Sequence, residues 1–215
     1  MGFKISDLAV QIGAAAIWLL MSAAAPGAEM LDRVLAVVSG DLILMSDVRA
    51  ARTFGFVTVE GDDPGGQALT RLIERALILA EVERFAPPEP ESAAVDSGVA
   101  ALRQRFPSQA AFAAALAQTG IEERHLREYV RQDLRMNAYL DQRFTSIPPP
   151  EDELGRYYRE HPDLYTQNGV LMPFDAARAE IVRLLTAQSR RTLVNDWVAG
   201  LRRRADVRIA AQPGL

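Results

Sequence analysis

Residues 31–48 (LDRVLAVVSGDLILMSDV) constrain the fold more than any other stretch of this chain, because they read as a strand, a tight turn, a second strand and the start of a helix. Two β-rich apolar runs, at 34–38 and 42–44, are joined by the turn sequence SGD. Gly40 can adopt the positive φ that a tight hairpin turn demands, and Ser46 is the expected N-cap of the helix. A two-stranded hairpin is marginal alone in water, so we expect a third strand or a helical cover.

Apolar residues at three-four spacing predict helices along most of the remaining chain. The helix at 67–85 is expected at the centre of the fold, because Ile78 and Val82 widen its apolar stripe beyond one face. The segment 206–210 (DVRIA) is the other strand candidate. The expected fold class is mainly α: a multi-helix module with a small β-hairpin at the N-terminus completed by a C-terminal strand. The predicted helices cover residues 46–54, 67–85, 93–106, 108–119, 121–144, 150–161 and 174–205.

The first 28 residues differ from the rest and predict an export signal. Lys4 precedes an uncharged apolar run at 12–25, which is too short for a comfortable membrane span but suits the core of a signal peptide. Small residues around Ala25 satisfy the cleavage rule. We therefore expect a signal peptide at 1–28 and a mature domain at 29–215. The alternative is an uncleaved segment that anchors the protein, which would be its only contact with the membrane.

Composition excludes several classes of partner and chemistry. The net charge of −4 argues against nucleic acid as the main partner, because phosphate binding favours a basic surface. Cysteine is absent, which excludes disulfides, thiolate catalysis, zinc–thiolate sites and a lipid anchor on cysteine.

No group of residues forms a catalytic motif, so we predict no catalytic residue, no metal site and no small-molecule cofactor. The two histidines, His125 and His161, sit among charged neighbours on helices and are interpreted as surface residues. The acidic clusters at 122–123 and 151–153 lack the alternating oxygen ligands of an EF-hand, and helix first turns explain them better. The glycines at 61–66 lack the lysine and the strand–loop–helix context of a phosphate-binding loop.

Five segments occur in an order that resembles the SurA-type family of periplasmic chaperones and parvulin prolyl isomerases. Each segment alone is mostly a helix-core pattern, and together they span nearly the whole mature chain. The five segments are VLAVVSGDLILMSDV, ALTRLIERALILAEVERF, FPSQAAFAAALAQTGIEERHLREYVRQDLRMNAYLDQRF, PPPEDELGRYYREHPDLY and PFDAARAEIVRLLTAQSRRTLVNDWVAGLRRRADVRI.

The resemblance implies a chaperone module without the isomerase. In the family, the parvulin domain lies between the fourth and fifth segments, whereas here only residues 166–172 separate them. A SurA-like peptide-binding domain would then consist of an N-terminal part at 29–165 and a C-terminal helix and strand at 173–210. The implied function is an ATP-independent periplasmic holdase for unfolded proteins, above all outer-membrane protein precursors. The alternatives are a non-chaperone interaction subunit of an envelope complex and, less favoured, a peptidyl-prolyl isomerase.

The candidate peptide-binding residues are Tyr129, Met136, Leu140 and Phe144, which form one apolar row on the helix at 121–144. Methionine and aromatic side chains suit adaptable contacts with unfolded or extended polypeptide clients. The alternative is that these four side chains fill the core.

Overall fold

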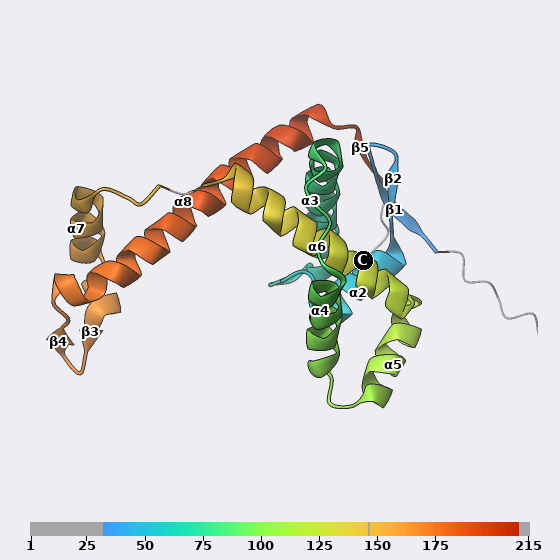
Figure 1. Ribbon diagram of the computed structural model, residues 1–215, viewed down its shortest axis with the longest axis horizontal. Coiled ribbons are helices and arrows are strands. Elements are labelled where there is room, and N and C mark those ends of the chain that lie inside the picture. Colours follow the sequence, from blue (N-terminus) through green and yellow to red (C-terminus); the bar gives the residue numbers. More distant parts are fainter. Residues whose placement is uncertain (1–31, 146, 211–215) are drawn as a thin grey trace, which may run out of the picture. The chain divides into compact units, whose positions relative to one another are not determined.

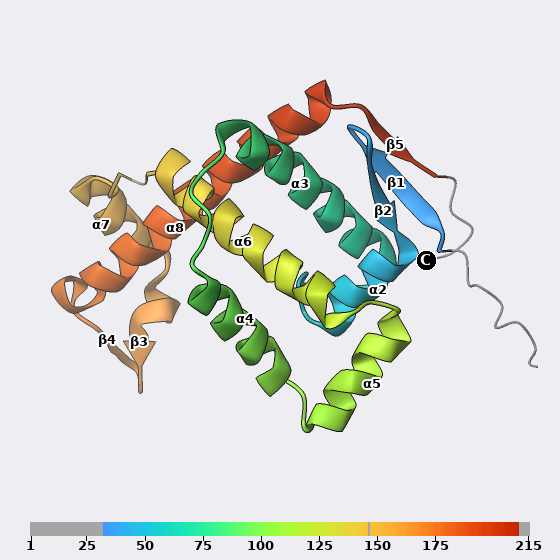
Figure 2. The same cartoon turned by 45° about the vertical axis from the view of Figure 1, so that its right-hand side comes forward.

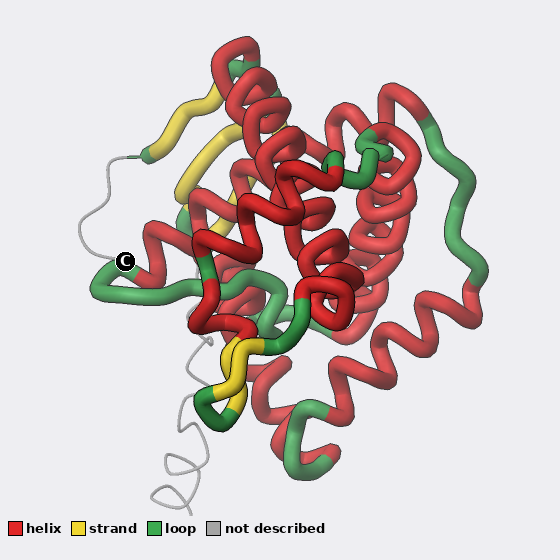
Figure 3. Tube along the Cα trace, turned by 90° about the vertical axis from the view of Figure 1, so that its left-hand side faces the viewer, coloured by secondary structure: helices red, strands yellow, loops and turns green. Residues whose placement is uncertain are grey.

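The computed structural model describes residues 32–145 and 147–210, and helices dominate this part of the chain (Figure 1; Figure 3). The predicted signal segment at 1–28 lies outside the described residues. The helices are α2 (Met45–Thr53), α3 (Pro64–Phe85), α4 (Ser92–Gln104), α5 (Gln109–Thr119), α6 (Glu123–Arg143), α7 (Glu151–Glu160), the 3-10 helix η1 (Pro162–Tyr165) and α8 (Phe174–Arg204). The strands are β1 (Val34–Val38), β2 (Asp41–Leu44), β3 (Thr166–Gln167), β4 (Val170–Leu171) and β5 (Val207–Ile209).

The three-stranded sheet confirms that the two ends of the described chain meet. Strand β1 lies between β2 and β5 and is antiparallel to both (Figure 2). The turn between β1 and β2 holds Ser39 at φ 51° and Gly40 at φ 102°, as a two-residue type I′ turn requires. On the other side of β1, Ala36 pairs with Ile209. The predicted fold class, mainly α with a hairpin completed by a C-terminal strand, is confirmed.

The start of α2 differs from the prediction. The helix begins at Met45, and its N-cap is Leu44, so Ser46 lies inside the first turn and the predicted cap is wrong. Asp47 accepts a hydrogen bond from the Leu44 N–H at 2.7 Å and thereby stabilises the helix start. The carboxylate thus binds the N–H of the N-cap residue, whereas a serine cap would accept from an N–H in the first turn of the helix.

Helix α3 begins earlier than predicted, at Pro64. Asp63 caps it, because its Oδ1 accepts a hydrogen bond from the Gly66 N–H at 2.9 Å. Pro64 occupies the first turn, where its missing N–H costs nothing. The two glycines that follow favoured a loop in the sequence, but the cap outweighs their low helix propensity.

Helix α3 lies at the centre of the fold, as predicted. It contacts β1, β2, α2, α6 and α8. Leu69 and Ile73 belong to a core cluster with the sheet and α2. Ile78 and Val82 belong to a second cluster with α6 and α8. Two clusters on different sides of one helix explain its wide apolar stripe.

Helix α8 is buried near both of its ends and exposed in between. Towards its N-terminus, Ile181 packs in a cluster with Leu154 of α7 and Tyr165 of η1. Towards its C-terminus, Val198 packs against residues of α3 and α6. Leu193, between these two regions, is 48% exposed. The long helix thus joins a small satellite cluster to the main core.

Residues 166–172 form a β-hairpin of β3 and β4 that the sequence analysis missed. Asn168 and Gly169 make its two-residue turn, with φ of 52° and 76°. The Met172 N–H closes the hairpin on the Tyr165 carbonyl at 2.8 Å. The Asn-Gly dipeptide is a strong hairpin signal, although flanking strands of two residues are too short for an alternating pattern.

Candidate functional site

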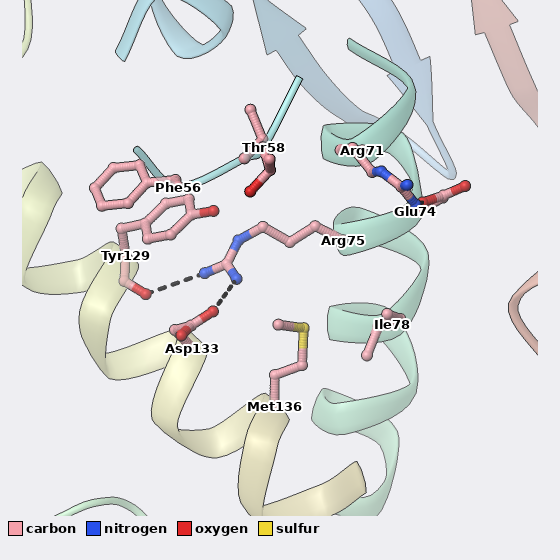
Figure 4. A pocket seen from close by; sticks show the side chains of 10 residues that line it. Phe56, Thr58, Arg71, Glu74, Arg75, Ile78, Tyr129, Asp133 and Met136 are labelled. Atoms are coloured by element: carbon pink, nitrogen blue, oxygen red, sulfur yellow. Dashed lines mark hydrogen bonds and ion pairs between the residues drawn. The ribbon is translucent and has the colours of Figure 1, made fainter. Parts of the chain in front are cut away.

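A pocket of about 400 Å³ lies between α3, α6 and the loop that joins α2 to α3 (Figure 4). Helix geometry explains its walls, because side chains three or four residues apart share one face of a helix. The loop contributes Phe56, Val57 and Thr58, α3 contributes Arg71, Glu74, Arg75 and Ile78, and α6 contributes Tyr129, Asp133 and Met136.

Three flat groups stack along one side of the pocket. The ring of Phe56 lies parallel to that of Tyr129, with centroids 3.7 Å apart. The guanidinium of Arg75 lies against the same tyrosine, with its Cζ 3.7 Å from the ring centroid. A cation over an aromatic face is attracted by the ring's quadrupole, and more strongly where water is excluded. The stack therefore links the loop, α6 and α3.

Arg75 is 8% exposed, and its charge is matched by hydrogen bonds. It donates to Oδ1 of Asp133 at 3.0 Å and to the carbonyl oxygen of Tyr129 at 3.0 Å (Figure 4). A buried guanidinium without such acceptors would be costly, so these contacts fix the side chain between the two helices.

The electrostatics of the pocket favour a neutral ligand. Burial raises the pKa of Tyr129 to about 12, an effect that Arg75 opposes and Asp133 reinforces, so the phenol is uncharged at neutral pH. The charged side chains form two opposite pairs, Arg71 with Glu74 and Arg75 with Asp133, each at 3.0 Å. The lining therefore combines apolar surface with polar groups and has no excess of either charge.

The four predicted binding residues fall into two environments along α6. Tyr129 and Met136 line the pocket. Leu140 is half-buried against the cluster of α3, α6 and α8, and Met136 also contacts that cluster. Phe144 lies beside Trp197 of α8, with ring centroids 5.4 Å apart. The row is thus partly pocket wall and partly packing, and peptide binding by these four residues stays a prediction.

Phe56, Thr58 and Arg75 also line the pocket, and the sequence analysis did not single them out. Arg75 carried a detectable signal, because it is a charged residue on a helix whose apolar pattern predicts burial on several sides. Phe56 and Thr58 carried none, since they lie in a loop without a repeating pattern.

A second aromatic group surrounds the C-terminal end of α6. The Cζ of Arg143 lies 5.1 Å from the Trp197 ring and 5.7 Å from the Phe144 ring. Tyr139 lies between Trp197 and Phe85, and Phe85 is 52% exposed. This group joins α3, α6 and α8 and leaves some aromatic surface accessible.

The two histidines have local structural contacts. Nδ1 of His125 accepts a hydrogen bond from the Glu122 N–H at 3.0 Å, which caps the start of α6. His161 stacks on Tyr157 at 4.1 Å between ring centroids, and its Nδ1 lies 2.9 Å from the Tyr157 carbonyl oxygen. Both are exposed, as the sequence indicated.

Among residues 32–145 and 147–210, no three His, Cys, Asp or Glu side chains come together in a group that could hold a metal ion. Within the same ranges, no helix has the length and apolar character needed to cross a membrane.

Comparison with known proteins gives a result at the level of the fold. No protein-family model and no curated protein matches this sequence. Several solved structures match, among them one with a TM-score of 0.52 and 10% sequence identity, over 83% of this chain and 99% of the other chain. It comes from work on two proteins of Campylobacter jejuni, the virulence factor PEB4 and the periplasmic protein Cj1289, described as structurally related SurA-like chaperones. The chain therefore shares its fold with SurA-like chaperones.

Proposed function

We propose that this protein is an ATP-independent holdase that binds unfolded polypeptides in the periplasm, with outer-membrane protein precursors as its main clients. The observation that carries the proposal is a charge-balanced pocket lined by aromatic side chains and a methionine, on a fold shared with SurA-like chaperones. Such a lining suits many different apolar side chains, because methionine and stacked rings adapt to shape without demanding a particular charge.

The proposed domain organisation has an N-terminal part at 29–165 and a C-terminal helix and strand at 173–210, without a parvulin domain. The hairpin of β3 and β4 supports this proposal, since its two-residue turn connects the two parts directly. We propose peptide binding without catalysis, and a signal peptide at 1–28 that directs the protein to the periplasm. The membrane would be contacted only through that segment, if it stays uncleaved.

Aggregation assays test the proposed function. Mature protein is mixed with three unrelated unfolded clients, one of them an outer-membrane β-barrel precursor, and light scattering is followed without ATP. We expect less scattering for all three clients, with the largest effect on the barrel precursor. An absence of suppression for every client would contradict the holdase proposal.

Two matched variants connect the activity to the pocket. Met136→Asp places a charge in the pocket wall, while Asn137→Asp places the same charge on the exposed neighbouring residue. Because a carboxylate next to an apolar client side chain is costly, the first variant is expected to lose suppression and the second to keep it. Unfolding midpoints of both variants establish that they are folded.

Other outcomes distinguish the alternative functions. Capture of one tight, stoichiometric partner from the periplasm, without suppression of unrelated clients, would favour an interaction subunit of an envelope complex. Acceleration of Xaa-Pro isomerisation that a point substitution in this chain abolishes would favour an isomerase. A tagged precursor should appear in the periplasm shortened by about 24 to 28 residues, whereas full-length protein in the inner membrane would favour the anchor.

A further inference from the structure

The loop beside the pocket contains a short strip of chain with the pattern of a β-strand. Val57 and Val59 are half-buried and pack on the core cluster next to the sheet, while Thr58 and Glu60 are exposed. This alternation has the period of two that an extended chain gives. Figure 4 shows the side chain of Thr58 pointing into the pocket.

The main chain of this strip is hydrogen-bonded at both ends. The N–H groups of Phe56 and Val57 donate to the Ala51 carbonyl at 2.8 and 3.4 Å. At the other end, the Glu60 N–H donates to Oε1 of Gln67 at 3.0 Å. Between these anchors, the N–H and carbonyl groups of Thr58 form no hydrogen bond with any other residue in the described ranges.

Main-chain groups of this kind offer a template for another chain. In an extended strand, the N–H and carbonyl of one residue point to the same side, so a single residue of an antiparallel partner can exchange both hydrogen bonds with Thr58. Side chains of directly opposed residues project from the same face. The side chain of that partner residue would therefore enter the pocket beside Thr58, towards Phe56, Tyr129 and Met136.

We propose that an extended segment of a client polypeptide pairs with this strip, with one apolar client residue bonded to Thr58 through its main chain and seated in the pocket through its side chain. This inference rests on the proposed function and specifies how a client is recognised. The pairing also restricts the client sequence, because a proline at the position opposite Thr58 has no N–H to donate.

The chemistry of the site favours a polypeptide over other ligands. A peptide supplies one donor and one acceptor per residue, which matches the N–H and carbonyl of Thr58, both without a hydrogen-bond partner among residues 32–145 and 147–210. The opposite charges of Arg71 with Glu74 and Arg75 with Asp133 balance within the pocket wall, so a neutral backbone and an apolar side chain fit better than a charged ligand. Main-chain pairing is also tolerant of client sequence.

N-methylated peptides test the pairing on the unchanged protein. The probe is a fluorescein-labelled heptapeptide of serine and threonine with one central leucine. The leucine fixes the register, because it is the only apolar side chain of the peptide. Binding to the mature protein is followed by fluorescence anisotropy. Methylation of the leucine nitrogen removes the donor to Thr58 and should weaken binding about tenfold or more. Methylation of the next nitrogen, which points to the opposite side of the strand, should change affinity by no more than about twofold.

Two substitutions at Thr58 provide the complementary test. Thr58→Pro removes the main-chain N–H, whereas Thr58→Val keeps the main chain and the side-chain shape and removes only the hydroxyl. We expect the proline variant to bind the peptide at least about tenfold more weakly than the valine variant, because both change the side chain and only the proline variant also removes the N–H. Unfolding midpoints of both variants are compared, and the methylated peptides keep the inference falsifiable if the proline variant is unstable.

The outcomes separate this inference from the proposed function. Equal affinity for all three peptides, or equal loss with both methylated peptides, would overturn the pairing. If clients are still protected from aggregation, the proposed holdase function stands and another mode of recognition carries it. Failure to bind the unmodified peptide also overturns the pairing, and a simultaneous failure to protect any client overturns the proposed function as well.

Discussion

The guanidinium of Arg75 on α3 lies over the ring of Tyr129 on α6, with its Cζ 3.7 Å from the ring centroid. The same arginine donates a hydrogen bond to the carbonyl oxygen of Tyr129, so the two residues are joined through both side chain and main chain. This contact joins the two helices that form the pocket. It also links the stability of the fold to the shape of the candidate site.

Replacing Arg75 by methionine tests this link. Arg75→Met keeps an unbranched apolar stem but loses the hydrogen bonds and the cation–π contact, so we expect the free energy of unfolding to fall by about 1–3 kcal/mol. Arg71→Met is the matched control, because its side chain is 59% exposed and pairs with Glu74 on the same helix. Its effect should stay within about 0.5 kcal/mol. Urea unfolding measures both, and equal effects would contradict the role given to Arg75.

The raised pKa of Tyr129 predicts a loss of stability in alkaline solution. The folded pKa of about 12 lies above the ordinary value near 10, so the folded state holds its proton more tightly. The stabilisation is fully present below about pH 10 and is lost as the pH rises towards 12. It amounts to at most about 2–3 kcal/mol.

Tyr129→Phe isolates this contribution, because it keeps the ring and removes the titrating group. Between about pH 9 and 11.5, the free energy of unfolding should fall more steeply for the unsubstituted protein than for the variant. Parallel curves would mean that Tyr129 titrates normally. The variant is needed as a reference, because burial also raises the pKa of Tyr165 and the alkaline loss of stability in the unsubstituted protein therefore includes both tyrosines.

Trp197 should contribute to stability as a half-buried residue. It packs against the main core and against the cluster shared by α3, α6 and α8. Trp197→Ala is expected to lower the free energy of unfolding by about 2–3 kcal/mol, somewhat less than a fully buried tryptophan would give. Leu193→Ala, at an exposed position of the same helix, should change it by less than about 0.5 kcal/mol. A loss under about 1 kcal/mol at Trp197 would refute its packing role.

The closing strand β5 predicts the effect of truncation. A chain that ends at Ala205 leaves the side of β1 that pairs with Val207 and Ile209 open, and an open edge beside apolar side chains promotes aggregation. We expect this version to aggregate or to unfold without cooperativity. A chain that ends at Ile209 keeps the pairing residues and should unfold like the full mature protein. Equal thermal midpoints for all three proteins would refute the closure.

Features governed by local chemistry were predictable from the sequence. The hairpin of β1 and β2 could be predicted, because its turn needs a positive φ and Gly40 provides one. The central position of α3 was also predictable, since an apolar stripe wider than one face requires cover on several sides. The start of α3 was missed. The cap by Asp63 favours an early helix start and the two glycines oppose it, and the apolar pattern does not show which effect is larger.

The candidate site was predictable in part. Tyr129 and Met136 were found because an apolar row on a long helix can be counted along the sequence. That Leu140 and Phe144 pack towards α8 could not be deduced, since the row itself does not specify which neighbour covers each turn. Phe56 and Thr58 were missed because an irregular loop has no repeating pattern.

By itself, the sequence determined the helices, the hairpin of β1 and β2 and the pairing of β5 with β1, because turn residues and apolar periodicity act over a few neighbouring positions and a lone hairpin needs a partner strand. Only the tertiary structure decided which side chains form the pocket. Arg75 meets Tyr129 because α3 and α6 pack side by side, and the loop beside Thr58 closes one wall because Phe56 stacks on that same ring. Such contacts depend on how helices distant in sequence are oriented around a shared core, and no local pattern specifies that orientation.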